Sequence, residues 1–313
     1  MEVLIVGGAG DVGRYLAKVL PPKGHKLTIL DQAPPPLWFN ENLTLTYLQG
    51  NISDATITKD AVRGKDLVIH LAWSFANDPY TIFDTDIKGH THLLEAASSS
   101  GVKGFIYTST ATVYGRAVVH PVTEAHQCLI GEARKPLYAL GKLTAEELCK
   151  YYHKTRGLHV TIFRFWWAFG DSIGGSHLRD LIRKAIKNEP LELVRGAGGA
   201  FITMADLESA ILLAASRPIA SGQTYNLGSF FLTWEEIVKI IVHLTNSNSP
   251  IQFIPSEQWR GPAFLSEVWD LDWSKATTEL GFRPTASAKM TLSLFTEAIK
   301  TCIINVQKDA LQK

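Results

Sequence analysis

The sequence has few cysteines and almost no net charge. Its three cysteines, Cys128, Cys149 and Cys302, lie far apart in 313 residues, and this odd, scattered set argues against a disulfide framework. The 31 lysines and arginines are balanced by 30 aspartates and glutamates, which gives a net charge of +1. No overall field therefore attracts nucleic acid or an anionic membrane, and we expect a small-molecule partner instead.

Long apolar runs and metal-binding patterns are also missing. No hydrophobic stretch approaches the roughly 20 residues that span a bilayer, and the first residues run directly into a strand-like segment that leaves no room for a signal peptide. We therefore expect a cytoplasmic protein without a membrane partner. The 10 histidines form no His-Glu-x-x-His pattern, and none pairs with a cysteine at ligand spacing, so the sequence predicts no metal site.

The sequence does contain short β-branched segments that alternate with longer helical patterns. Its 46% of hydrophobic residues supply a large core, and the alternation predicts βαβ units in an α/β protein. We expect a Rossmann-type, doubly wound parallel sheet with a smaller, mostly C-terminal substrate-binding region. The expected strands are residues 3–6, 26–30, 43–48, 67–71, 105–107 and 160–165, and the expected helices are 12–20, 82–98 and 136–153.

The chain is expected to form two regions. Residues 1–165 and 200–229 are predicted to form the dinucleotide-binding Rossmann domain, and residues 166–199 and 230–313 the substrate-binding region. From about Trp234 onward, helical segments alternate with loops that carry proline and tryptophan. This composition suits a cap over a pocket.

A glycine-rich segment follows the first predicted strand and opens a helix. In Gly7-Gly8-Ala9-Gly10-Asp11-Val12-Gly13, the missing side chains let the backbone approach a pyrophosphate, and the helix N-terminus offers free N–H groups and partial positive charge. Asp31 ends the second strand about 20 residues later, where an acid can accept hydrogen bonds from both adenosine ribose hydroxyls. Its charge would repel a 2′-phosphate, so the sequence predicts NAD rather than NADP.

A second signal is the segment Tyr138-Ala139-Leu140-Gly141-Lys142 inside a helical pattern, with hydroxyls at 108–110 after an earlier strand. Residues four apart share a helix face, so the Lys142 ammonium can lie beside the Tyr138 phenol. A free phenol has a pKa near 10, and a base near neutrality needs a shift of roughly 3 units, about 4 kcal/mol. A neighbouring ammonium and an oxidised nicotinamide can supply stabilisation of that order.

The order of these features resembles the extended short-chain dehydrogenase/reductases, the NAD-dependent epimerase/dehydratase family that includes UDP-galactose 4-epimerase. The resemblance covers nearly the whole chain. Its further matches are Asn51-Ile52-Ser53-Asp54, His70-Leu71-Ala72, Thr110-Ala111-Thr112-Val113-Tyr114-Gly115, Tyr225-Asn226-Leu227-Gly228-Ser229, Ser274-Lys275-Ala276 and Leu280-Gly281-Phe282-Arg283-Pro284.

The resemblance implies specific roles. Tyr138 would be the acid/base, Lys142 would lower its pKa and hold the nicotinamide ribose, and Thr110 would orient the reacting hydroxyl, giving a keto intermediate after hydride transfer. Helices 82–98 and 136–153 would form a homodimer interface. The implied NAD contacts are Gly7, Gly10, Asp11, Val12, Gly13, Asp31, Asn51, Ile52, Leu71, Ala72, Trp73, Thr108, Tyr138, Lys142 and Trp166.

The sequence departs from the family pattern on the substrate side. Ala111-Thr112 replace the Asp-Glu pair of the dehydratases, and the loop also lacks the glutamate of the decarboxylases that make UDP-xylose. Trp167 replaces an asparagine that contacts nucleotide-sugar phosphates, and Gly199 replaces an arginine that pairs with the diphosphate. Asp86 stands where the family has an asparagine, which keeps an acceptor and loses a donor.

Three functions remain open at this point. The first is a NAD-dependent epimerase or dehydrogenase for a sugar or sugar nucleotide. The second is an alcohol dehydrogenase or ketone reductase for a flat, apolar substrate without a nucleotide, and the third is a dinucleotide-sensing regulator without catalysis. Aromatic residues near the cleft are either core or a stacking wall for substrate. The candidate substrate residues are Phe75, Thr112, Trp167 and Arg260.

Overall fold

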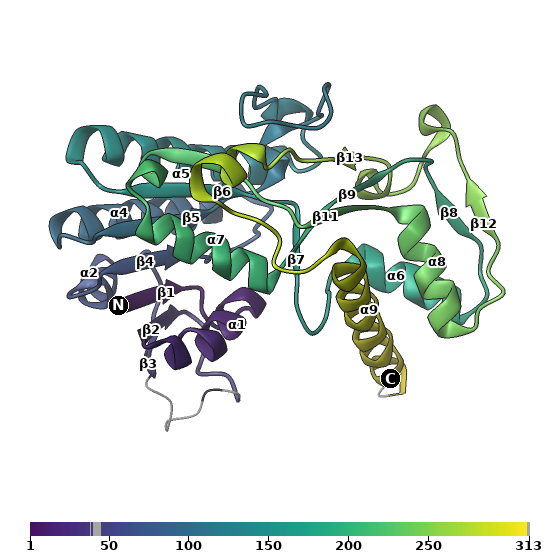
Figure 1. Ribbon diagram of the computed structural model, residues 1–313, viewed down its shortest axis with the longest axis horizontal. Coiled ribbons are helices and arrows are strands. Elements are labelled where there is room, and N and C mark those ends of the chain that lie inside the picture. The colour runs from purple at the N-terminus through teal and green to yellow at the C-terminus, as the bar shows by residue number, and fades with distance from the viewer. Residues whose placement is uncertain (38, 40–44, 312–313) are drawn as a thin grey trace.

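A seven-stranded parallel sheet forms the larger part of the protein (Figure 1). The structure is a computed structural model that describes residues 1–37, 39 and 45–311. The strand order is β10-β6-β5-β4-β1-β2-β3, and every neighbouring pair is parallel. The strands are β1 (Glu2–Val6), β2 (Lys26–Asp31), β3 (Leu45–Gln49), β4 (Leu67–His70), β5 (Gly104–Thr108), β6 (Val160–Arg164) and β10 (Gln223–Asn226).

Helices cover both faces of this sheet, which confirms the predicted doubly wound architecture. On one face, α1 (Asp11–Val19) and α7 (Met204–Ser216) pack their buried side chains against Val3 and Ile5. On the other face lie α2 (Ala55–Val62), α4 (Lys88–Ser99) and α5 (Pro136–Arg156), which pack against Leu4 and Val6. Because β1 is covered on both sides, its sequence is continuously apolar instead of alternating.

The predicted strands and helices are confirmed within a few residues at their ends, and residues 43 and 44 of the third predicted strand lie outside the described residues. The predicted helix 82–98 starts earlier, with the short α3 (Pro79–Thr81), and continues through a π-helical segment, Ile82–Ile87, into α4. The carboxylate of Asp78 caps this start by accepting from Thr81 N at 2.8 Å. Helix α2, which the sequence analysis did not predict, begins in the same way at Asp54.

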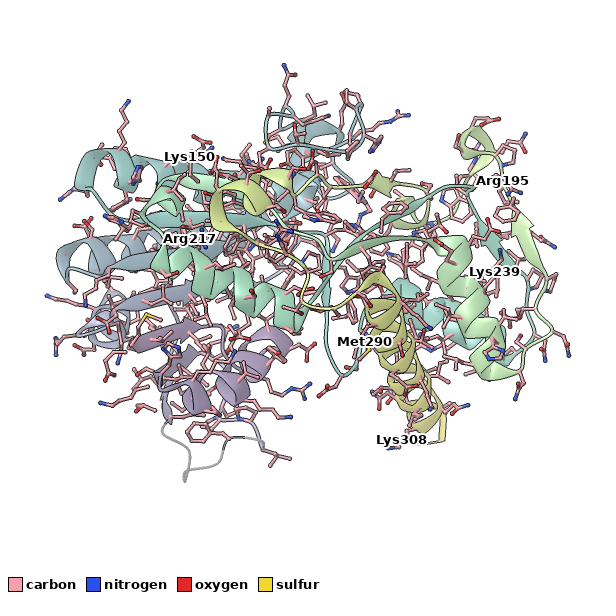
Figure 2. The ribbon with its side chains drawn as sticks, in the orientation of Figure 1. Lys150, Arg195, Arg217, Lys239, Met290 and Lys308 are labelled. Atoms are coloured by element: carbon pink, nitrogen blue, oxygen red, sulfur yellow. The ribbon has the colours of Figure 1, made fainter. Side chains whose placement is uncertain are left out.

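Two short sheets and three α-helices make up most of the smaller region, among the residues that the structure describes. In the first sheet, β9 (Gly198–Thr203) pairs with β11 (Phe230–Thr233), β13 (Val268–Trp269) and β7 (Trp167–Phe169). The second joins β8 (Leu191–Leu193) to β12 (Ile251–Phe253). Helices α6 (Ser176–Ile186), α8 (Trp234–Thr245) and α9 (Ala288–Leu311) enclose a core of their own. Figure 2 shows the labelled Met290 and Lys308 along α9, near the C-terminal end of the chain.

The chain passes from the seven-stranded sheet to the four-stranded sheet directly after β6, because the next strand, β7, pairs with β9. The main sheet takes its strands from residues up to 164 and from 223–226, whereas β9 belongs to the smaller sheet. The predicted domain division at 165, 200 and 229 stays a prediction. No helix within the described part of the chain is long and apolar enough to cross a membrane.

Candidate active site

The turn between β1 and α1 brings backbone unusually close to backbone. Gly7 has φ +82°, and a Cβ added there would lie 2.6 Å from Ala72 N. A Cβ at Gly13 would lie 2.4 Å from Gly8 Cα. Helix α1 starts after Gly10, and no side chain caps it, so its first N–H groups remain available to a ligand. This bare helix start fits the pyrophosphate of a dinucleotide.

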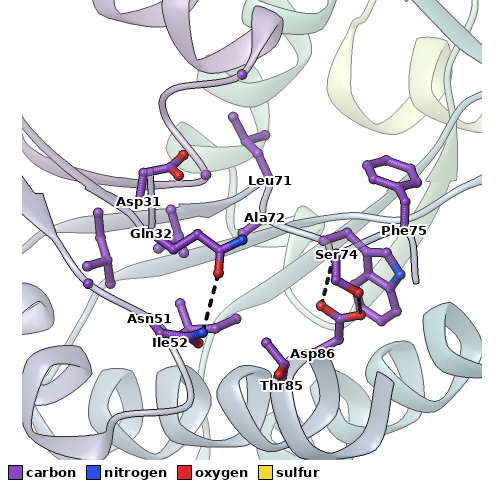
Figure 3. A pocket seen from close by; sticks show the side chains of 16 residues that line it. Asp31, Gln32, Asn51, Ile52, Leu71, Ala72, Ser74, Phe75, Thr85 and Asp86 are labelled. Atoms are coloured by element: carbon purple, nitrogen blue, oxygen red, sulfur yellow. Dashed lines mark hydrogen bonds between the residues drawn. The ribbon is translucent and has the colours of Figure 1, made fainter. Parts of the chain in front are cut away.

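The carboxylate of Asp31 lies at the end of β2, beside the glycine turn. It accepts from Ala9 N at 2.9 Å and from Ala33 N at 3.0 Å, one bond to each oxygen. Each oxygen keeps acceptor capacity for a ribose hydroxyl, so Asp31 fits the role that the sequence predicts. Figure 3 shows the adjoining pocket. It is lined by Val6, Gly7, Gly10, Leu30, Asp31, Gln32, Gly50, Asn51, Ile52, Leu71, Ala72, Trp73, Ser74, Phe75, Thr85 and Asp86.

We expect Gly13→Ala to destabilise the protein by about 1–3 kcal/mol and to weaken NAD binding, because the new methyl group meets rigid backbone. Gly131→Ala is the matched control, since a Cβ there has no neighbour within 4 Å. Urea unfolding and fluorescence titration with NAD measure both effects. Equal behaviour of the two variants would contradict the assignment of the turn.

Tyr138 lies in the first turn of α5, between the hydroxyl of Thr110 and two aromatic rings. The Thr110 hydroxyl is near enough to the Tyr138 phenol to lower its pKa, and Thr110 Oγ1 accepts from Thr112 N at 3.2 Å. Phe75 stacks on the Tyr138 ring at 5.6 Å with an interplanar angle of 17°, and Trp73 meets it edge-on at 6.3 Å. The structure thus brings together residues from three separate segments of the sequence.

The protonation of Tyr138 depends on its surroundings. Burial raises the pKa of Tyr138 to about 12, and the Thr110 hydroxyl and the positive charge of Arg134 oppose this shift. The phenol is therefore protonated near neutral pH in the chain without cofactor. That Lys142 lowers the pKa of Tyr138 stays a prediction, since in the structure Arg134 is the cation that acts on the phenol.

Lys142 is almost fully buried, with 3% of the residue exposed. Its Nζ donates to Thr108 O at 2.9 Å and lies 4.2 Å from the centre of the Trp73 ring. Burial lowers the pKa of Lys142 to about 7, although the carboxylates of Asp86 and Glu146 oppose the shift. Its charge is therefore sensitive to any group that enters the neighbouring pocket.

The buried ammonium predicts a pH effect on stability. The pKa of Lys142 falls from 10.5 in the unfolded chain to about 7 in the folded chain, so the unfolded chain binds more protons between these values. The contribution of Lys142 to the free energy of unfolding therefore rises with pH across this range. In urea unfolding without cofactor, wild type should gain stability relative to Lys142→Met between about pH 7 and about pH 9.5. A difference that does not change with pH would contradict this expectation.

Asp86 and Trp73 are further buried groups beside Lys142. Asp86 accepts from Ser74 N at 2.9 Å and from Ser74 Oγ at 2.6 Å, so the aspartate is satisfied by a neighbouring donor. The indole Nε1 of Trp73 is buried and has no hydrogen-bond partner among the described residues. An unpaired buried donor at the pocket wall suits an acceptor on a bound cofactor.

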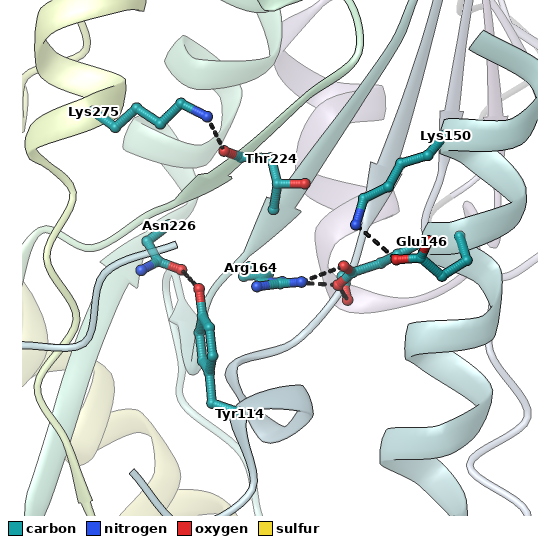
Figure 4. A network of polar contacts seen from close by, with 9 residues as sticks. Tyr114, Glu146, Lys150, Arg164, Thr224, Asn226 and Lys275 are labelled. Atoms are coloured by element: carbon teal, nitrogen blue, oxygen red, sulfur yellow. Dashed lines mark hydrogen bonds and ion pairs between the residues drawn. The ribbon is translucent and has the colours of Figure 1, made fainter. Parts of the chain in front are cut away.

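Glu146 was not found by sequence reasoning, although it continues the spacing of four from Tyr138 and Lys142. Its carboxylate accepts from Arg164 Nε at 2.9 Å, from Arg164 Nη2 at 2.5 Å and from Ser109 Oγ. Figure 4 shows the Arg164 guanidinium facing Glu146. This buried pair fixes the end of β6 against α5, beneath the segment that carries Thr110.

Other predicted residues lie apart from the nucleotide pocket. Asp11 is largely exposed and pairs with Arg14 at 3.6 Å. Trp166 stacks on Phe264 at 5.0 Å, and Trp167 stacks on Phe201 at 5.7 Å. Both tryptophans are partly buried and pack against the core of the smaller region. The Arg260 guanidinium donates to the carbonyls of Glu257 and Trp259 in its own loop. The roles of these residues stay predictions.

The sheet order, the bare helix start after a glycine turn and the acid at the end of β2 define a dinucleotide-binding α/β protein of the Rossmann type. Residues 3–228 match the NAD dependent epimerase/dehydratase family, and the chain belongs to that family. It is therefore an NAD-dependent enzyme of the extended short-chain dehydrogenase/reductase type, as the sequence predicted. Membership in this family of enzymes argues against the third alternative, a dinucleotide-sensing regulator without catalysis.

Known relatives and structures agree with this assignment. The chain is 31% identical over 273 residues to a UDP-N-acetyl-alpha-D-glucosaminuronate decarboxylase of Bacillus cytotoxicus, a match that covers 82% of this chain and 84% of the relative. The fold is similar to UDP-glucose 4-epimerase of Thermotoga maritima, with a TM-score of 0.77, 22% identity and coverage of 99% and 100%. It is equally similar to the dTDP-glucose 4,6-dehydratase DesIV of Streptomyces venezuelae, with a TM-score of 0.77, 22% identity and coverage of 96% and 97%.

Proposed function

We propose that the protein is an epimerase or dehydrogenase that oxidises a secondary hydroxyl of a sugar or sugar nucleotide. The observation that carries the proposal is the grouping around Tyr138: the rings of Phe75 and Trp73 pack against its ring, and the Thr110 hydroxyl acts on the pKa of its phenol. Lys142 lies one helical turn away on α5. The ring of Trp73 joins this group to the nucleotide pocket, because Trp73 lines the pocket and contacts both Tyr138 and Lys142.

Each residue of the proposed site has a separate role in the oxidation. Tyr138 removes the proton of the substrate hydroxyl, and Thr110 orients that hydroxyl by a second hydrogen bond. Lys142 holds the nicotinamide ribose, while the glycine turn and Asp31 hold the pyrophosphate and the adenosine ribose. NAD held by these residues would supply the hydride acceptor for the substrate carbon. Tyr138 returns the proton when the carbonyl is reduced again, which completes an epimerisation, and a dehydrogenase releases the ketone instead.

A sugar nucleotide is supported by the relatives, whose names contain UDP and dTDP sugars. The alternative is an apolar substrate without a nucleotide. It is favoured by Trp167, which packs in the aromatic core in place of a phosphate-binding asparagine, and by Gly199, which takes the place of a diphosphate-binding arginine. The loss of a bidentate phosphate ligand weakens a charged substrate's binding unless another cation compensates.

A difference-absorbance screen at about 340 nm distinguishes these substrates, because reduction of bound NAD gives a new absorbance band. The NAD-loaded protein is mixed in parallel with sugar nucleotides, free sugars and apolar alcohols. We expect a signal with sugars or sugar nucleotides that Tyr138→Phe abolishes. A signal with apolar alcohols alone would support the alternative, and a signal that survives in Tyr138→Phe would contradict the mechanism.

Three further expectations accompany this proposal. The division into a Rossmann domain (1–165 and 200–229) and a substrate-binding region (166–199 and 230–313) and the cytoplasmic location are proposed from the sequence. We also propose a homodimer formed through α4 and α5, by analogy with the family. A monomeric mass at micromolar concentration in light scattering would contradict the dimer.

A further inference from the structure

Arg134 is a cation that neither the family resemblance nor the nucleotide pocket explains. It lies just before α5, and 24% of its side chain is exposed. The guanidinium carbon lies 4.6 Å from the centre of the Phe264 ring, and Phe264 in turn stacks on Trp166 and His177. Arg134 therefore lies at the edge of the aromatic cluster in the smaller region. The segment that carries it leads directly into α5, the helix of Tyr138 and Lys142.

The Arg134 guanidinium has an unused donor. Its Nε is buried and has no hydrogen-bond partner within residues 1–37, 39 and 45–311. The nearest carboxylate oxygen is Glu267 Oε2 at 3.8 Å, which is too far for a hydrogen bond, and that oxygen already accepts from Trp269 Nε1 at 2.9 Å. A half-buried guanidinium with a free, buried Nε–H is costly unless an acceptor joins it. The arrangement is suited to an anionic group that is brought by a ligand.

The position of Arg134 links it to the reacting group. It precedes Tyr138 by four residues, and its positive charge acts on the Tyr138 phenol and on the His177 ring. Tyr138 and His177 come from the main sheet region and from α6 of the smaller region, respectively. Arg134 thus lies between the proposed acid/base and the region that is expected to hold substrate.

We propose that Arg134 binds a carboxylate of the substrate, so that the enzyme acts on a sugar acid. This inference rests on the proposed function and specifies its substrate class. A guanidinium binds a carboxylate through two parallel N–H···O bonds. One guanidinium charge is matched by one carboxylate charge, whereas a dianionic phosphate would bring a second negative charge close to Glu267.

The experiment measures binding to the NAD-loaded protein by isothermal titration calorimetry, independently of turnover. The probes are D-glucuronate against D-glucose, UDP-glucuronate against UDP-glucose, and D-glucose 6-phosphate. We expect wild type to bind the acidic member of each pair roughly tenfold or more tightly than its neutral partner. Arg134→Gln should lose this preference through weaker binding of the acid, with little change for the neutral sugar, and Arg134→Lys should restore part of it.

Lys135→Gln is the matched control, because it removes the same charge from the neighbouring exposed residue and should keep the preference. Melting temperature and NAD affinity check that each variant is folded. The proposal is overturned if wild type shows no preference for the acids, including the case in which no probe binds, if Arg134→Gln keeps the preference, or if glucose 6-phosphate binds better than glucuronate. Preferential binding of the acids without any reduction of NAD would contradict the proposed function and leave the role of Arg134 intact.

Discussion

Tyr138→Phe is expected to lower turnover by about 10²–10⁴-fold while NAD stays bound, because the change removes the proton acceptor and little else. The phenylalanine ring keeps the stacking with Phe75 and the edge contact with Trp73. Since Tyr138 does not line the nucleotide pocket, the affinity for NAD should remain near that of wild type. Steady-state rates on the substrate found by the absorbance screen, together with NAD titration, measure the two effects separately.

Tyr151→Phe serves as the control for this change. Tyr151 lies on the same helix and is 55% exposed, so the loss of its hydroxyl should alter neither rate nor stability. If Tyr138→Phe retained near wild-type turnover, the assignment of the acid/base would be wrong. If it lost NAD together with activity, the role of Tyr138 would be mainly structural.

Arg164→Met should destabilise the protein by about 3–5 kcal/mol, the largest loss of stability that we expect, because it leaves the Glu146 carboxylate buried without its cation. The two side chains are joined by two hydrogen bonds, and their exposed fractions are 4% and 0%. Urea unfolding measures the change. Lys150→Met is the control, since the Lys150–Glu147 pair is in close contact at 2.7 Å but is largely exposed. Its loss should cost within about 0.5 kcal/mol.

A double variant separates the ion pair from its packing. When Glu146 becomes leucine and Arg164 becomes methionine, no buried charge remains unpaired, so the double variant should be more stable than Arg164→Met. Ser109 loses its acceptor in this variant, because its Oγ donates to Glu146, and a part of the loss should remain. A double variant that is less stable than Arg164→Met alone and Glu146→Leu alone would show that the pair stabilises the fold beyond charge compensation.

The sequence predicted most of the fold because its signals are local. Continuous apolar segments such as residues 3–6 form strands covered on both faces, and spacings of three and four residues form one-sided helices. The spacing of four also placed Tyr138 and Lys142 on one face of α5. The start at Asp78 was missed because a capping aspartate followed by proline was not considered, although that signal is present in the sequence.

The candidate site was predictable where function depends on backbone geometry. The glycines at 7 and 13 are required by contacts with Ala72 and Gly8, and such close approaches leave a visible pattern in the sequence. The partners of charged side chains leave no such pattern. The sequence places Lys142 on the helix face of Tyr138, but it does not record that the Lys142 Nζ donates to Thr108 O and lies over Trp73, because these partners come from other segments of the chain.

By itself, the sequence determined the order of strands and helices, the dinucleotide-binding turn and the pairing of a tyrosine with a lysine on one helix. Each of these depends on residues close together in the chain. Only the tertiary structure decided that Arg134 lies against Phe264 and near Glu267, more than a hundred residues later in the sequence. Such neighbours are set by the packing of the smaller region against the main sheet, and no local periodicity records them.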